Sequence, residues 1–176
     1  MKTIKLIKVI TLLTLFPTAS LISQENPTLS DPEVASVAVV ANQIDISYAE
    51  IAVKKSKNKE ILDFANRMIT DHNAVINQAV ALVTKLSVTP KDNVISQSLL
   101  EGAEKTKKTL RKATRKNFDK LYIDNEVAYH KAVIAAVKDL LIPESDNKEL
   151  KGLLQTVLPA LEAHLGRAEM VQIKLK

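Results

Sequence analysis

The sequence predicts an all-α protein, built as a four-helix bundle whose second and third helices are joined by a helical crossover. Four long segments repeat apolar residues at alternating spacings of three and four, which is the pattern of a helix face. No stretch alternates polar and apolar residues as a half-buried strand would, and the 176 residues include only three glycines. About 150 residues follow the N-terminal leader, enough for one domain with its own core.

That leader, MKTIKLIKVITLLTLFPTASLIS, has the layout of a secretory signal peptide. Lysines precede an apolar run from Val9 to Phe16, and small residues follow where cleavage would occur. The run is much shorter than the roughly 20 residues that span a bilayer, and no later segment is suited to span one. We therefore expect residues 1–23 to be cleaved and the mature protein to be periplasmic. The alternative is an uncleaved membrane anchor.

The formal net charge of +5 overstates how basic the mature protein is. The leader contains three of the 25 basic residues and none of the 20 acidic ones, which leaves the mature chain near +2. This balance and an aromatic content of 3% argue against a nucleic-acid-binding protein, which needs a basic surface and rings for base stacking. The chain has no cysteine, so the fold must be stabilised without disulfides.

The first predicted helix covers residues 31–55 and follows a polar lead-in at residues 24–30. Ser30 or Asp31 can cap its start, and Glu33 complements the helix dipole. Its apolar stripe is Val34, Val37, Ala41, Ile44, Tyr48 and Ile51.

The second predicted helix runs from about residue 59 to residue 86, between a cap at Asn58 and Pro90, which cannot continue a helix. Residues 94–112 form a less apolar helix, long enough to carry the chain back along the bundle. The second helix and the next long one would then run parallel, which is the connectivity of ferritin-like proteins. The alternative is an up-and-down bundle with one additional helix.

The remaining helices are predicted at residues 118–141, capped by Asn117 and closed by Pro143, and from about residue 146 to the C-terminal region. Asp146 and Glu149 stand at capping-box spacing at the start of the last helix.

The three histidines of the chain, His72, His130 and His164, all fall on apolar stripes. At 1.5 Å per residue, His72 and His130 lie about 21 Å and about 20 Å from the starts of their helices, so parallel helices bring them level. His164 lies about 27 Å along the last helix, a height that the antiparallel neighbour reaches near Glu126. Asp45, on the flank of the first helix's stripe, is at the same level.

This polar layer has two interpretations. Imidazole nitrogen and carboxylate oxygen bind zinc, and also iron, copper or manganese, so the layer predicts a site for a divalent metal. The candidate ligands are His72, His130, His164, Glu126 and Asp45. Alternatively, the rings belong to a buried hydrogen-bond network without metal. The candidate partners in such a network include Tyr48, Tyr122 and Tyr129.

Catalysis is less favoured by the sequence than binding. A ferritin-type di-iron site needs Glu-x-x-His on two helices, but the residues three before the histidines are Ile69, Val127 and Leu161. Asp71 is adjacent to His72 and is expected to point elsewhere. A small metalloenzyme with a zinc-bound water remains the alternative to a non-catalytic bundle.

Four segments of the chain resemble one bacterial family: ANQIDISYAEIAVKKSKNKEILDFANRMITDHNAV, VTPKDN, FDKLYIDNEVAYHKAV and LPALEAHL. They resemble the exported family called Domain of Unknown Function 4142, over about residues 31–165. The resemblance implies a ferritin-like fold and assigns His72, His130 and His164 to the histidine positions of the family. It implies no activity.

A basic segment, KTKKTLRKATRK, lies at the predicted crossover and has seven basic residues in twelve. An anionic envelope surface, such as lipid head groups or lipopolysaccharide phosphates, is a candidate partner for it. The side chains concerned are Lys105, Lys107, Lys108, Arg111, Lys112, Arg115 and Lys116. The alternative is a solvated helix face without a partner.

Overall fold

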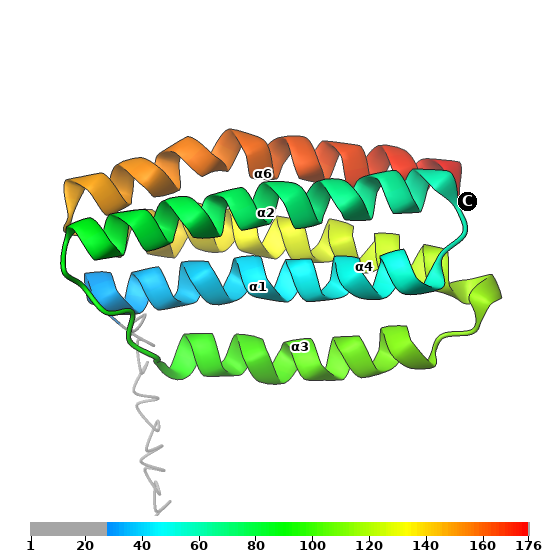
Figure 1. Cartoon of the computed structure of the whole chain (residues 1–176), viewed down its shortest axis with the longest axis horizontal. Coiled ribbons are helices and arrows are strands. Elements are labelled where there is room, and N and C mark those ends of the chain that lie inside the picture. Colours follow the sequence, from blue (N-terminus) through cyan, green and yellow to red (C-terminus); the bar gives the residue numbers. More distant parts are fainter. Residues whose placement is uncertain (1–27, 176) are drawn as a thin grey trace, which may run out of the picture.

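The computed structural model describes residues 28–175, which form an all-helical bundle without strands (Figure 1). The prediction of an all-α protein is therefore confirmed. The long helices are α1 (Asp31–Lys55), α2 (Lys59–Lys85), α3 (Val94–Lys112), α4 (Arg115–Ala136) and α6 (Lys148–Lys174). A π-helical turn, η1 (Val137–Leu141), and the short α5 (Ile142–Glu144) extend α4. The predicted leader and most of the polar lead-in lie outside the described residues.

Four helices enclose the core, and α3 lies outside them. Around the bundle, α1 packs against α2, α2 against α6, α6 against α4 and α4 against α1. The helix α3 packs mainly on the outer side of α1 and also touches α4. In Figure 1, α2 and α4 run in one direction, whereas α1, α3 and α6 run in the other. The structure thus has the predicted helical crossover, and not the up-and-down order.

Two of the four helix starts for which a cap was predicted have the predicted cap. Ser30 and Glu33 form a capping box at α1, and the Asn58 side chain accepts a hydrogen bond from the Glu60 backbone N–H at α2. At α6 the cap is Asn147, whose side chain accepts from two backbone N–H groups, so the prediction of an Asp146 cap is wrong. The Asp31 carboxylate instead accepts from the backbone N–H groups at the start of α6, which joins the first helix to the last.

Two boundaries of the fourth helix also differ from the prediction. The helix begins at Arg115 after Thr114, so the predicted cap Asn117 lies inside its first turn. Pro143 does not close the helix, which continues to Glu144. The π-helical turn explains why the helix continues past Pro143. The Ile142 N–H bonds to the Val137 carbonyl five residues back, so the i to i−4 hydrogen-bond pattern that a proline would break is already interrupted before it.

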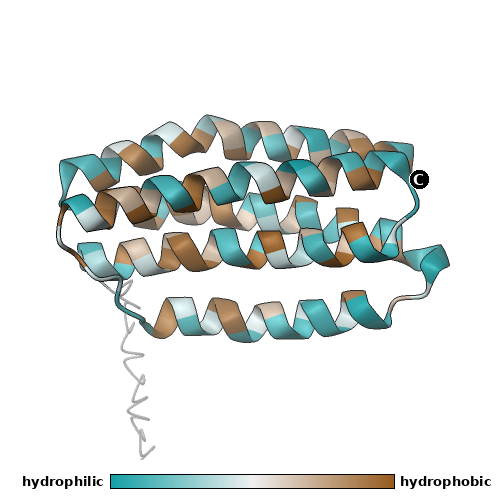
Figure 2. Ribbon diagram, in the orientation of Figure 1, coloured by the Kyte–Doolittle hydropathy of each residue, from teal (hydrophilic) through white to brown (hydrophobic). Residues whose placement is uncertain are grey.

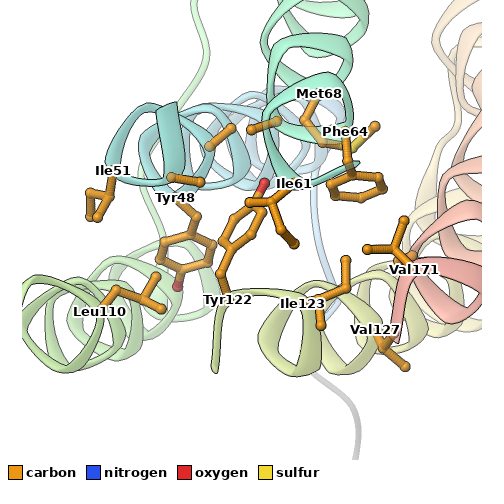
Figure 3. Packing of buried hydrophobic residues seen from close by; sticks show 14 of the residues in the cluster. Tyr48, Ile51, Ile61, Phe64, Met68, Leu110, Tyr122, Ile123, Val127 and Val171 are labelled. Carbon is orange, nitrogen blue, oxygen red and sulfur yellow. The ribbon is translucent and has the colours of Figure 1, made fainter. Parts of the chain in front are cut away.

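Hydrophobic residues recur along every helix (Figure 2) and fill the bundle in two clusters. One cluster occupies the end where α1 meets α2 and centres on Tyr48, Ile61, Phe64, Met68 and Tyr122 (Figure 3). The other fills the opposite end with Val34, Val37, Ile134, Leu141, Leu150 and Leu154. Among residues 28–175, no helix is both long and apolar enough to cross a membrane.

Candidate metal centre

The structure brings the three histidines into one layer between the two hydrophobic clusters. His72 on α2, His130 on α4 and His164 on α6 are 4%, 1% and 7% exposed. Their ring centroids lie 5.3 to 5.9 Å apart. The equal helix rise and the crossover topology explain this meeting, because both place the three positions at one height in the bundle.

Each imidazole has one nitrogen held by a protein oxygen. His130 Nδ1 donates to the backbone carbonyl of Glu126 (2.9 Å), one turn earlier in α4. His72 Nδ1 lies 2.7 Å from the Asn42 side-chain oxygen, and His164 Nε2 lies 2.9 Å from Asp71 Oδ2. Carbonyl and carboxylate oxygens only accept, so the protons reside on these nitrogens. The other nitrogen of each ring must then carry a lone pair.

The three lone-pair nitrogens are the unsatisfied ones. His72 Nε2, His130 Nε2 and His164 Nδ1 are buried and have no hydrogen-bond partner among the described residues. One nitrogen from each of the three rings lies within 4.8 Å of one nitrogen of each other ring. Buried polar atoms normally find partners, so these nitrogens are available to a proton donor or to a metal ion.

Two carboxyl groups complete the centre. Asp45 on α1 is 1% exposed, and its Oδ2 lies 3.4 Å from His72 Nε2 and 3.5 Å from His130 Nε2. Glu126 is fully buried beside them, with Oε2 at 3.7 Å from His130 Nδ1. Neither oxygen of Asp45 has a hydrogen-bond partner in the described chain. Against the larger effect of burial, the Asn125 side chain interacts with the Glu126 carboxyl group and lowers its pKa.

Although Asp45 lies on the flank of the α1 apolar stripe, it is buried and lies beside His72 and His130. Because α1 is covered by α2, α4 and α3, more of its circumference faces protein than an apolar stripe alone indicates. Asp45 therefore points inward, next to Ile44 in the core.

Burial dominates the electrostatics of the centre. It lowers the pKa of His72 to about 3 and that of His130 to about 4, so both rings are neutral at physiological pH. It also raises the pKa of Asp45 to about 8, and burial together with the charge of Asp45 raises that of Glu126 well above its usual range. Without a cation, the centre therefore favours neutral carboxyl groups.

Asp71 is a site residue that the sequence prediction placed elsewhere. As predicted from its place next to His72, Asp71 points in another direction than His72 does. In that direction its carboxylate meets His164 on the neighbouring helix α6. Arg67, one turn earlier, forms a short ion pair with the same carboxylate oxygen. Burial works in the opposite direction, but the hydrogen bonds from Arg67 and His164 hold the pKa of Asp71 below its usual range. The carboxylate is thus charged and orients the His164 ring.

The tyrosines do not serve the histidines as the network interpretation expects. Tyr129 donates to the Ala41 carbonyl (2.9 Å), and Tyr48 hydrogen-bonds to Thr106 on α3. Tyr122, wholly buried, has no hydrogen-bond partner within residues 28–175. The ring partners are instead Asn42, Asp71 and a backbone carbonyl.

Two sets of potential ligand atoms overlap at His130: the three imidazoles form one, and Asp45, Glu126 and His130 form the other. Both are fully buried, and both could hold a metal ion.

Comparison with known proteins gives a family and no activity. A family model described as Domain of unknown function (DUF4142) matches residues 17–171, which include every residue of the centre. No curated protein and no solved structure matches the chain. The match covers most of the sequence, and the chain therefore belongs to the DUF4142 family.

Proposed function

We propose that this protein is an exported helical bundle that binds a divalent transition metal, zinc foremost, through His72, His130, His164 and Asp45. The observation that supports the proposal is the meeting of three buried imidazoles, two of which have an unpartnered nitrogen within 3.5 Å of the buried Asp45 carboxyl group. Nitrogen and oxygen donors of this kind suit zinc, while iron, manganese and copper are the competing metals.

The separations between donor atoms fit a small four-coordinate ion. Metal–ligand bonds of about 2.0–2.1 Å in a tetrahedron place the ligand atoms about 3.3–3.4 Å apart. Asp45 Oδ2 already lies at 3.4 and 3.5 Å from the nitrogens of His72 and His130. The ring nitrogens, within 4.8 Å of one another, need only a modest contraction to reach the same spacing.

Charge and orientation support the same assignment. A divalent cation would neutralise the Asp45 and Glu126 carboxylates, which are otherwise too costly to ionise at this depth. Metal-binding histidines usually donate their second ring nitrogen to a carboxylate or carbonyl oxygen, and all three rings here are held by such oxygens.

We infer a binding function first, and a small metalloenzyme that keeps a water at an open zinc position is the catalytic alternative, since each set of potential ligands has three members. The competing function is a structural or envelope-stress protein without metal.

Zinc titration into the chelator-treated mature protein at pH 7.5 tests the proposal. Zinc at 100-fold above its Kd stabilises the native state by about 2.7 kcal/mol, which corresponds to a melting-temperature rise of about 5–10 °C for a domain of this size. His130→Gln should abolish that rise, since the amide replaces a ligand while it can still donate to the Glu126 carbonyl. An unchanged melting temperature together with no stoichiometric zinc uptake would refute metal binding.

The compartment is proposed on the N-terminal sequence alone. Cell fractionation should recover a periplasmic chain that begins between about Leu21 and Glu25. Recovery of the full-length chain in the inner membrane would contradict export with cleavage.

We also propose that the basic face of α3 contacts an anionic envelope surface. Lys105, Lys108, Arg111 and Lys112 line one surface depression, and no ion pair neutralises any of them within the described chain. Lys107, by contrast, is paired with Glu104. An uncompensated cluster of this kind creates a positive potential that attracts phosphate-bearing surfaces.

Cosedimentation with anionic liposomes at low salt tests this contact. Replacing Lys105, Lys108 and Lys112 by Gln should weaken it, and salt should weaken binding of the native protein. A triple variant with the same loss of charge at Lys59, Lys131 and Lys138 is the control. Equal binding of both variants, or no binding of the native protein, would favour a solvated face.

A further inference from the structure

A groove between α2 and α6 opens beside the metal centre. It encloses a cavity of about 370 Å³, which is within the range of small-ligand sites. His164 belongs to both the centre and the wall of the groove, and Phe64, Met68 and Ala163 supply apolar surface. Arg67 from α2 and Arg167 from α6 stand on its two sides.

The two arginines retain donors that their own partners do not use. Arg67 engages Asp71 through Nε, and Arg167 engages Glu60 Oε2 through Nη2 at 2.8 Å. A guanidinium has five N–H donors, so most donors of each arginine are still available to a ligand. The Arg67 and Arg167 side chains are 69% and 42% exposed, so their free donors are accessible from the groove.

The charges around the groove favour an anion. Asp63, the acidic residue of the wall, is paired with Lys59 at 2.7 Å. Glu60 is shared by Arg167 and Lys174, and Asp71 is shared by Arg67 and His164. The groove itself is lined by two arginines and one carboxylate, and the ion pairs around it, which add Lys59, Lys174, Glu60 and Asp71, bring the local total to four cations and three carboxylates.

We propose that this groove binds a compact oxyanion, a carboxylate or a phosphate, between Arg67 and Arg167 and against His164. Two guanidinium groups on facing helices provide the paired donors that such anions accept. The site goes beyond the proposed metal function and does not depend on it, because every group named belongs to the protein. The Arg67–Asp71–His164 chain nevertheless places Arg67, which would bind the anion, two hydrogen bonds from a candidate metal ligand.

Residue-resolved NMR of the full mature chain tests the proposal, with inorganic phosphate and acetate as separate probes. We expect saturable shifts at the amides of Arg67, Ala163 and Arg167. Arg67→Gln and Arg167→Gln should each weaken binding by about tenfold, the effect of losing one charge-assisted contact. Lys138→Gln, an equal charge loss at an ion pair with Glu162 outside the groove, is the matched control.

The results of the two titrations distinguish a phosphate site from a carboxylate site, and both from the absence of an anion site in the groove. Shifts with phosphate alone support a phosphoryl ligand, and shifts with both probes support a carboxylate-tolerant site. Shifts confined to α3 would show that anions bind only the basic face, and this result would overturn the proposal. It would also be overturned if both arginine variants, with melting temperatures confirming that they fold, bound as tightly as Lys138→Gln.

Discussion

Replacing Asp71 by Asn should weaken zinc binding without a comparable loss of stability. The Asp71 carboxylate accepts the His164 Nε2 proton at 2.9 Å and so keeps the Nδ1 lone pair directed into the centre. An asparagine offers a neutral oxygen, or an N–H that favours the wrong tautomer. Loss of such an orienting partner typically lowers metal affinity 10- to 100-fold, or about 1.4–2.7 kcal/mol.

Chelator competition at pH 7.5 measures this effect directly. The matched control is Asp63→Asn, because Asp63 lies on the same helix and on the same groove but pairs with the exposed Lys59. We expect the control to bind zinc as the native protein does and both variants to melt near the native temperature. Unchanged affinity in Asp71→Asn, or an equal loss in Asp63→Asn, would refute the orienting role of Asp71.

Further predictions concern the centre without metal and the core around it. Metal-free protein should lose stability between about pH 6.5 and 8, because folding raises the pKa of Asp45 to about 8. Folding also raises the pKa of Glu126 well above its usual range. The stability that these protonated groups contribute at low pH is lost as the pH rises through their folded-state pKa values. The expected slope is about 1.4 kcal/mol per pH unit for each carboxyl group, and the histidines, whose pKa burial lowers, oppose it only below about pH 6.5. Urea denaturation at several pH values measures this slope, and a stability that rises toward pH 8 would contradict it. Tyr122→Phe should leave the free energy of unfolding unchanged or raise it by about 1 kcal/mol, since the hydroxyl is buried without a partner; a loss above that size would reveal a missed hydrogen bond. Lys55→Met should cost about 1–3 kcal/mol, because Lys55 Nζ donates to three carbonyls at the end of α3, whereas Lys54→Met should cost little.

The layer of three histidines was predictable from the sequence, because it depends on the helix rise and on the spacing of apolar residues. Helix rise and the spacing of apolar residues are nearly constant, so the levels of His72 and His130 follow once the crossover is assumed. The side-chain contacts between helices, by contrast, depend on which helices are neighbours in the bundle. Asp71 reaches His164 only because α2 neighbours α6, and nothing in the spacing of the sequence states that order.

The inward position of Asp45 has a similar origin. An apolar stripe marks one buried side of a helix, whereas α1 is covered by α2 and α4 of the bundle and, on a further side, by α3. The Asn42 contact with His72 follows from the same packing. A useful signal was the high density of small and apolar residues in α1, which indicates a helix with little exposed surface.

The polar layer carries a cost in stability that a bound cation would offset. Leucines at His72, His130 and His164 would join the two hydrophobic clusters into one core, whereas the polar layer leaves the ring nitrogens and the carboxyl oxygens of Asp45 unpartnered. Each buried orphan costs about 1–3 kcal/mol, a large fraction of the net stability of a domain. Without metal, the neutral Asp45 carboxyl group has one O–H and can donate to only one of the two ring nitrogens beside it, so a network alone leaves the other nitrogen unpaired. A divalent cation would satisfy the lone pairs and charges together, and this is the argument that most favours metal.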